Sequence, residues 1–159
     1  MAATLGEYDP ADFDALHALD LACYPPGISY SRRTLKWFLA LPGADCLVAK
    51  SDDDLAEILG FIIAEADEGE GHIITIDIAE SSRRAGVGTA LLREMEQRLA
   101  ARGVRRVSLE TATTNEPAVA FWRRHGYRSH GVLPHYYLGR LDAYSMSKKL
   151  AAPGGSNTR

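Results

Sequence analysis

Two apolar segments rich in β-branched residues stand close together in the middle of the chain, at 58–66 and 72–79. Only the acidic, glycine-containing run 67–71 separates them, and so short a connection joins antiparallel strands as a hairpin. Parallel neighbours need a crossover of a dozen residues or more. The hairpin therefore predicts a mixed sheet and excludes a doubly wound dinucleotide-binding fold, whose sheet is almost wholly parallel.

Helical and strand patterns continue on both sides of this hairpin. Asp9-Pro10 predicts the start of a helix that ends at Tyr24-Pro-Pro-Gly. Apolar residues four apart from Val87 to Leu99 predict a longer helix that stops at Gly103. The other predicted elements are helices over 31–39 and from 117 to 125, and strands over 3–8, 46–50, 104–111, 127–133 and 143–150. The order β-α-α-β-β-β-α-β-α-β-β predicts an α/β protein of the α+β type, with a mixed, mostly antiparallel central sheet flanked by about four helices.

Length and charge narrow the class of protein. A chain of 159 residues fits one domain and buries roughly 70% of its unfolded surface. We expect a single domain over 1–150 and a disordered tail over 151–159, where small and polar residues, Gly and Pro prevail. A net charge of −3 argues against a nucleic-acid-binding protein. No apolar run approaches the ~20 residues of a membrane span, and two cysteines imply no disulfide framework. We therefore expect a cytoplasmic monomer or homodimer that binds neither nucleic acid nor membrane.

The most specific local pattern is the run from Arg83 to Thr89 (Arg-Arg-Ala-Gly-Val-Gly-Thr), between a predicted strand and a predicted helix. Its two glycines let a ligand approach the backbone closely, and the N-terminus of a helix favours an anion. The run lacks the Gly-Lys-Ser/Thr of a P-loop, and Leu91 stands where a dinucleotide fingerprint has its third glycine. It therefore predicts a phosphate or pyrophosphate site of another kind. The alternative is a tight turn with solvated arginines.

Three motifs in order resemble one family, the GNAT acetyltransferases. The run from Arg83 to Gly88 is similar to the Arg/Gln-x-x-Gly-x-Gly/Ala signature of that family, in which this loop wraps the pyrophosphate of acetyl-CoA. The stretches from Leu109 to Tyr127 and from Pro134 to Met146 resemble two further family motifs. The last is typical of ribosomal-protein-alanine and related protein N-terminal acetyltransferases. The resemblance covers 72–150 and implies a GNAT fold, acetyl-CoA as co-substrate, and direct attack of a primary amine on the acetyl group.

The resemblance also implies which residues contact acetyl-CoA. They are Ile76, Ile78, Arg83, Arg84, Gly86, Val87, Gly88, Thr89, Asn115 and Trp122. Backbone N–H groups on the strand from Ile76 to Ile78 would stabilise the oxyanion, with Ile78 as the best candidate, and would pair with the pantetheine arm. Asn115 has a second reading as the cap of the following helix.

Two candidate catalytic residues follow from the same resemblance. Glu110 matches the family glutamate and is the candidate base, which is useful because an α-amine has a pKa near 7.7–8.0 and a lysine near 10.4. An exposed strand carboxylate without a role is the alternative. Where the family has a tyrosine that protonates the leaving thiolate, this chain has Trp122, whose indole N–H is no practical proton donor. We favour Tyr137 as the acid, with Tyr136, a water-mediated route and departure as the thiolate as alternatives.

The acceptor amine should be selected by the loops at 24–30 and 134–142. Tyr30 and Tyr136 in these loops could hydrogen-bond a peptide backbone, so the predicted acceptor is the N-terminal α-amine of a protein or peptide. A small amine such as a polyamine or an amino-sugar is the second possibility. A non-catalytic acyl-CoA-binding module is the third, because Trp122 replaces the tyrosine. Three histidines recur every five residues from 125 to 135, a spacing that fits no single helix or strand face, and we predict no metal.

Overall fold

The structure is a computed structural model that describes residues 3–152. Within them the elements are β1 (Ala3–Glu7), a short 3-10 helix (Pro10–Asp12), α1 (Phe13–Cys23), α2 (Arg32–Leu39), β2 (Ala44–Ser51), β3 (Ile58–Asp67), β4 (Glu70–Ile78), a second 3-10 helix (Glu80–Ser82), α3 (Val87–Ala101), β5 (Arg106–Ala112), α4 (Glu116–Arg124), β6 (Arg128–Tyr137) and β7 (Leu141–Lys149). The seven strands of this region form one sheet in the order β1-β2-β3-β4-β5-β7-β6. The predicted α+β class and the predicted order of elements are confirmed.

The helix ends lie where the sequence predicts them. Asp9 caps the first turn before α1 through its side chain, which accepts from the N–H of Ala11 at 2.8 Å. Ser31 caps α2 by accepting from the N–H of Thr34 at 3.1 Å. Gly103 follows α3 with a φ of +90°, a left-handed conformation that ends helices and costs glycine little.

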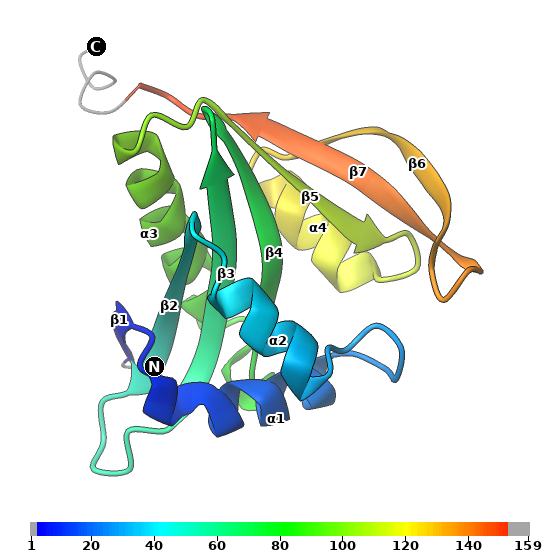
Figure 1. Cartoon of the computed structure of the whole chain (residues 1–159). Coiled ribbons are helices and arrows are strands. Elements are labelled where there is room, and N and C mark those ends of the chain that lie inside the picture. Colours follow the sequence, from blue (N-terminus) through cyan, green and yellow to red (C-terminus); the bar gives the residue numbers. More distant parts are fainter. Residues whose placement is uncertain (1–2, 153–159) are drawn as a thin grey trace.

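Helices cover both faces of the sheet, α3 and α4 on one side and α1 and α2 on the other (Figure 1). The core under α3 and α4 includes Leu91, Met95 and Trp122. The core under α1 and α2 is smaller and includes Leu16 and Leu35. The sheet is therefore covered on both faces over β2, β3 and β4.

The sheet opens between β4 and β5. Among the described strands these are the one pair of parallel neighbours, and their pairing covers only 70–72 on β4 and 106–108 on β5. Both strands continue beyond this point, and Figure 1 shows them diverging toward α1. The opening is bounded by the second half of β4 and by the end of β5. We call it the β4–β5 opening.

Two connections differ in length from the prediction. The hairpin between β3 and β4 is a two-residue turn, Glu68-Gly69, with φ of +49° and +83°, so the predicted loop over 67–71 is too long. The predicted loop over 134–142 is also wrong, because β6 continues to Tyr137. A register shift between Leu133 and Tyr137 lets β6 include Pro134, which has no N–H to donate to the ladder. Residues 153–159, most of the predicted tail, lie outside the described residues.

Candidate functional site

The turn that leads into α3 uses its two glycines for different reasons. Gly86 has a φ of +87°, and a Cβ added there would meet nothing within 4 Å. A Cβ on Gly88 would lie 3.2 Å from Cε1 of Phe121 on α4. Glycine is thus favoured at 86 by the backbone conformation and at 88 by the close approach of Phe121. The space in front of Gly86 leaves the N-terminus of α3 accessible to an anion.

The two arginines before this turn differ in their surroundings. The Nε of Arg83 donates to the carbonyl of Ile78 at 3.1 Å, and its Nη2 lies 3.5 Å from Sγ of Cys23 at the end of α1. Arg84 is exposed and has a φ of +66°, which is uncommon for a side chain of this size. Arg83 therefore ties the loop to β4 and α1, while Arg84 adds an exposed positive charge next to the helix N-terminus.

The backbone of β4 faces the β4–β5 opening at Ile76 and Ile78. The N–H of Ala79 donates to Leu59 of β3 at 2.8 Å, and successive residues of a strand direct their polar backbone groups to opposite sides. The backbone groups of Ile76 and Ile78 therefore point away from β3, toward β5, beyond the last β4–β5 pair. These are the two residues predicted to supply backbone N–H groups.

Tyrosines from the loop between α1 and α2 bond to the carbonyls along this edge of β4. The hydroxyl of Tyr24 donates to the carbonyl of Ile76 at 2.9 Å, and that of Tyr30 to the carbonyl of Ile74 at 3.4 Å. Burial, followed by the nearby Asp77, raises the pKa of Tyr24. Tyr24 is a site residue that the sequence analysis missed, although the loop that contains it was predicted to select the acceptor.

Glu110 lies on the opposite side of the opening, on β5, and is the centre of a polar cluster. Its Oε1 is 2.8 Å from Nε2 of His72 and 3.5 Å from the hydroxyl of Tyr136, while the hydroxyl of Tyr137 donates to its backbone carbonyl at 3.4 Å. Tyr30 belongs to the same neighbourhood, since Tyr136 and Tyr137 are among the groups that act on it electrostatically. The structure thus brings together all four of the predicted catalytic and acceptor-binding residues, and it adds His72.

The titration of this cluster reflects its partial burial. The hydrogen bond with Glu110 raises the pKa of His72 above its usual value, against the opposing effect of burial. Burial, followed by the neighbouring Tyr136 and Glu110, raises the pKa of Tyr137. The imidazole thus keeps a proton more readily than a free histidine does, and the phenol of Tyr137 releases its proton less readily than a free tyrosine does.

A pair of buried acids lies behind β4, under α1. Asp20 and Asp77 are both fully buried. Oδ2 of Asp20 accepts from the N–H of Tyr30 at 2.7 Å, and Oδ1 of Asp77 accepts from the hydroxyl of Thr75 at 2.6 Å. Burial, followed by a hydrogen bond with Asp20, raises the pKa of Asp77 well above its ordinary range. These contacts connect Asp20 of α1 to the following loop through Tyr30, and Asp77 to Thr75 on β4, behind the residues that face the opening.

Two predicted cofactor residues have other roles in the described structure. Trp122 is 5% exposed and packs edge-on against Tyr127, whereas its neighbour Phe121 lies next to Gly88 at the start of α3. The amide oxygen of Asn115 accepts from the N–H of Ala118 at 3.2 Å and so caps α4. That cap is the second reading of Asn115 given above, and contact of either residue with acetyl-CoA stays a prediction.

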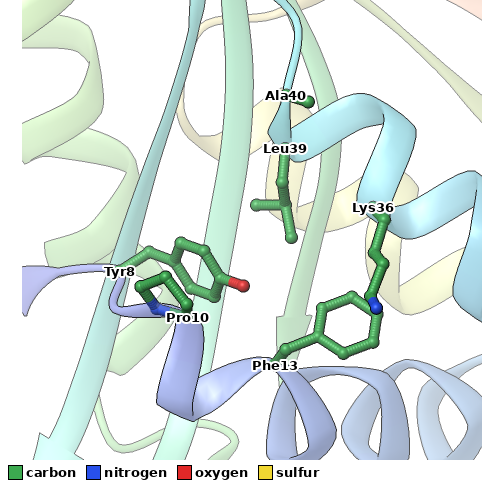
Figure 2. A pocket seen from close by; sticks show the side chains of 6 residues that line it. All are labelled: Tyr8, Pro10, Phe13, Lys36, Leu39 and Ala40. Atoms are coloured by element: carbon green, nitrogen blue, oxygen red, sulfur yellow. The ribbon is translucent and has the colours of Figure 1, made fainter.

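One pocket of about 370 Å³ lies at the other end of α1, away from the opening (Figure 2). Its lining residues are Tyr8, Pro10, Phe13, Lys36, Leu39 and Ala40.

Within 3–152 no group of three or more His, Cys, Asp and Glu side chains is placed to hold a metal ion. In the same range, none of the helices is both long and apolar enough to cross a membrane.

Two proteins are similar in sequence to part of this chain. An uncharacterized N-acetyltransferase of Methanocaldococcus jannaschii is 37% identical over 93 residues, which cover 58% of this chain and 60% of the relative. An N-alpha-acetyltransferase of Sulfurisphaera tokodaii is 32% identical over 107 residues, which cover 59% of this chain and 64% of the relative. The chain thus spans less than two thirds of the length of either relative.

Solved structures share the whole fold. The ribosomal-protein-S18-alanine N-acetyltransferase of Escherichia coli superposes with a TM-score of 0.84 at 21% identity, over 99% of each chain. Ard1 of Thermoplasma volcanium superposes with a TM-score of 0.86 at 23% identity, over 95% of this chain and 99% of the other. The model of the GNAT acetyltransferase family matches residues 13–127, which contain α1, the β4–β5 opening, the loop before α3 and α4. The chain belongs to the GNAT family of acetyltransferases.

Proposed function

We propose that the chain transfers the acetyl group of acetyl-CoA to the N-terminal α-amine of a protein or peptide. The observation that carries this proposal is the β4–β5 opening. One of its sides is a strand edge with backbone groups directed into it, the other carries Glu110, and the N-terminus of α3 lies at the end of β4. Such an arrangement offers partners for an extended arm on the strand edge, for an anion at the helix and for an amine near the carboxylate.

The residues around the opening fit the chemical groups of acetyl-CoA. The helix N-terminus at Val87, Gly88 and Thr89, with Arg83 and Arg84 beside it, suits a pyrophosphate. The N–H groups of Ile76 and Ile78 suit an amide-containing arm and an oxygen on which negative charge develops. Acetyl-CoA would supply an activated acyl group with a thiolate as leaving group.

Glu110 is the proposed source of base function on the β5 side. An α-amine is largely protonated at neutral pH and must lose a proton to attack and form its bond to the acetyl carbon. The carboxylate of Glu110 is the proposed acceptor of that proton. When the carbon–sulfur bond breaks, the thiolate either leaves as such or takes a proton from Tyr137. The raised pKa of Tyr137 favours the first route.

Three tyrosines and the relatives support a peptide as the acceptor. Tyr30, Tyr136 and Tyr137 place their hydroxyls around Glu110 and β4, where a peptide backbone offers N–H and C=O partners. One relative carries the name N-alpha-acetyltransferase, and one structure of the same fold acts on a ribosomal protein. The same hydroxyls could bind a polyamine or an amino-sugar, which stays the second candidate.

Thiol release from acetyl-CoA with short peptides and with small amines tests the proposal. We expect release with peptides that have a free α-amine and none with the same peptides blocked at that amine. Glu110→Gln should reduce the rate by about 10²-fold or more, the usual contribution of a positioned base. Release with small amines alone would show that the acceptor is a small amine and not a peptide. Binding of acetyl-CoA without any turnover would favour a non-catalytic acyl-CoA-binding module.

A further inference from the structure

We propose that the side of β5, β7 and β6 that faces away from α3 and α4 binds the acceptor chain beyond its N-terminus. We further propose that this surface selects acceptors with acidic side chains about four residues from the α-amine. The inference rests on the proposed function and names the class of acceptor. It starts from the sheet, because α1 and α2 cover only part of this side of it (Figure 1).

The uncovered part of the sheet begins at β5. The core under α1 and α2 takes its strand residues from β2, β3 and β4. On β5, Val107 and Leu109 point to the other side of the sheet and are buried in the core under α3 and α4. Ser108 and Glu110 alternate with them, point to the uncovered side and remain partly exposed. This side of β5 is therefore a surface on which another chain can lie.

Three serines form the middle of this surface. Ser108 of β5 is opposite Ser147 of β7, and Glu110 of β5 is opposite Ser145 of β7. Directly opposite residues of neighbouring strands direct their side chains to the same face. We call the surface formed by Ser108, Ser145 and Ser147 the serine face. These side chains are small, and each hydroxyl can donate and accept a hydrogen bond, which suits the backbone of an extended peptide.

One end of the serine face meets the proposed acceptor site. Glu110 stands opposite Ser145, and the hydroxyl of Tyr136 lies 3.5 Å from Oε1 of Glu110. The hydroxyl of Tyr137 donates to the backbone carbonyl of Glu110 at 3.4 Å. An acceptor with its α-amine at Glu110 therefore has the serine face as the adjoining surface for its following residues.

Positive charge gathers at the opposite end of the serine face. Arg128 of β6 is opposite Ser147, and Lys149 of β7 is opposite Arg106 of β5, so all three cations point to the same side. Arg106 forms an exposed ion pair with Glu70 at 3.2 Å. Arg128 and Lys149 are exposed, and among the described residues neither has a carboxylate within ion-pair distance. These two cations therefore complement acidic side chains of a bound chain.

The register of the strands indicates which acceptor residues reach the two cations. Neighbouring strands lie about 4.8 Å apart, and a strand rises about 3.3 Å per residue. Arg128 is two strands and two residues from Glu110, a Cα separation of about 12 Å. Lys149 is one strand and four residues from Glu110, about 14 Å. An extended acceptor covers either distance with about four residues, so acidic side chains at about its fourth and fifth positions are placed to meet the cations.

The test compares kcat/KM of the full chain for two acceptor peptides at low ionic strength. The peptides share their first three residues, and one has Glu and the other Lys at the fourth and fifth positions. An exposed ion pair contributes about twofold to fivefold, so two such contacts should make the wild type prefer the Glu peptide by about tenfold. The preference should shrink as salt rises, because exposed charges are screened. A tripeptide of the shared residues does not reach the cations and is the reference for catalysis alone.

Three variants assign the preference to the two cations. Arg128→Gln combined with Lys149→Gln should abolish the preference and keep wild-type kcat/KM for the tripeptide, which also establishes that the variant is folded. Arg128→Glu combined with Lys149→Glu should reverse the preference, so that the Lys peptide becomes the better acceptor. Arg93→Gln is the control matched to Arg128→Gln alone. It removes an exposed positive charge from α3, on the other side of the sheet, and should leave the preference unchanged.

The tripeptide separates failure of this inference from failure of the proposed function. Equal kcat/KM for the two longer peptides in the wild type would overturn the inference, and so would a preference that survives the removal of both cations. In either case acetylation of the tripeptide leaves the proposed function intact. If neither the tripeptide nor a longer peptide is acetylated, the proposed function fails and this inference fails with it.

Discussion

Asp77→Asn should make the protein more stable at neutral pH and should remove a pH dependence that the wild type has. In the folded protein, burial and Asp20 raise the pKa of Asp77, so the folded state binds one more proton than the unfolded state above pH 4. Stability then falls as pH rises, by about 1.4 kcal/mol per unit for as long as Asp77 keeps its proton. Asparagine supplies a permanent N–H toward Asp20 and a carbonyl toward Thr75.

The quantity to measure is the difference in free energy of unfolding between Asp77→Asn and the wild type. The other titrating groups are the same in both proteins, so their contributions cancel in this difference. Above about pH 5 the free energy of unfolding of Asp77→Asn relative to the wild type should rise with pH, by no more than about 1.4 kcal/mol per pH unit, measured by urea unfolding. Asp54→Asn, in an exposed turn, is the control and should show a flat difference. Asp77→Ala should lose about 2 kcal/mol, because it leaves polar groups of Thr75 and Asp20 without their partner.

A difference between Asp77→Asn and the wild type that stays constant with pH would refute this reasoning. It would mean that Asp77 is ionised in the folded protein and that the two carboxyl groups do not share a proton. A loss of stability in Asp77→Asn at every pH would instead mean that the amide does not fit between Asp20 and Thr75.

Three further substitutions test separate parts of the structure. Gly86→Ala should lower the free energy of unfolding by about 1 kcal/mol in thermal unfolding, because the φ of +87° strains any residue with a side chain. A larger loss would indicate a steric clash, which is not expected because an added Cβ meets nothing within 4 Å. Tyr127→Phe should cost about 1.5 kcal/mol in urea unfolding by removing the 2.8 Å bond to Glu96, and no loss would mean that water replaces it. Tyr137→Phe should leave kcat within about twofold if the thiolate departs unprotonated, and a fall of about 10²-fold would identify Tyr137 as the acid.

The order of elements was predictable because each boundary has a local cause. Asp9-Pro10, Ser31 and Gly103 begin or end helices through groups within a few residues, and these ends are confirmed. The loop over 134–142 was wrong for a reason that is not local. Pro134 usually interrupts a strand, but a register shift against β7 keeps β6 continuous across it.

The site was predictable where a motif marks it. Glu110, Tyr136 and Tyr137 lie in stretches that resemble family motifs, and the structure places them together. His72 could not be found in this way, because a single histidine in a strand forms no recognisable motif. Its partner Glu110 is 38 residues away in sequence and comes close only because β4 and β5 pair in parallel. Asp20 did leave a signal, since it falls on the apolar face of α1 four residues after Leu16, where an acid needs a partner.

The most direct test of the account is the position of the acetyl group in a product. A peptide with a free α-amine and one internal lysine, incubated with acetyl-CoA and the protein, can be fragmented in a mass spectrometer to locate the modification. We predict one acetyl group, on the α-amine, and about 10²-fold slower formation of that product with Glu110→Gln. Acetylation of the lysine alone, or an unmodified peptide alongside rapid acetylation of a polyamine, would contradict it.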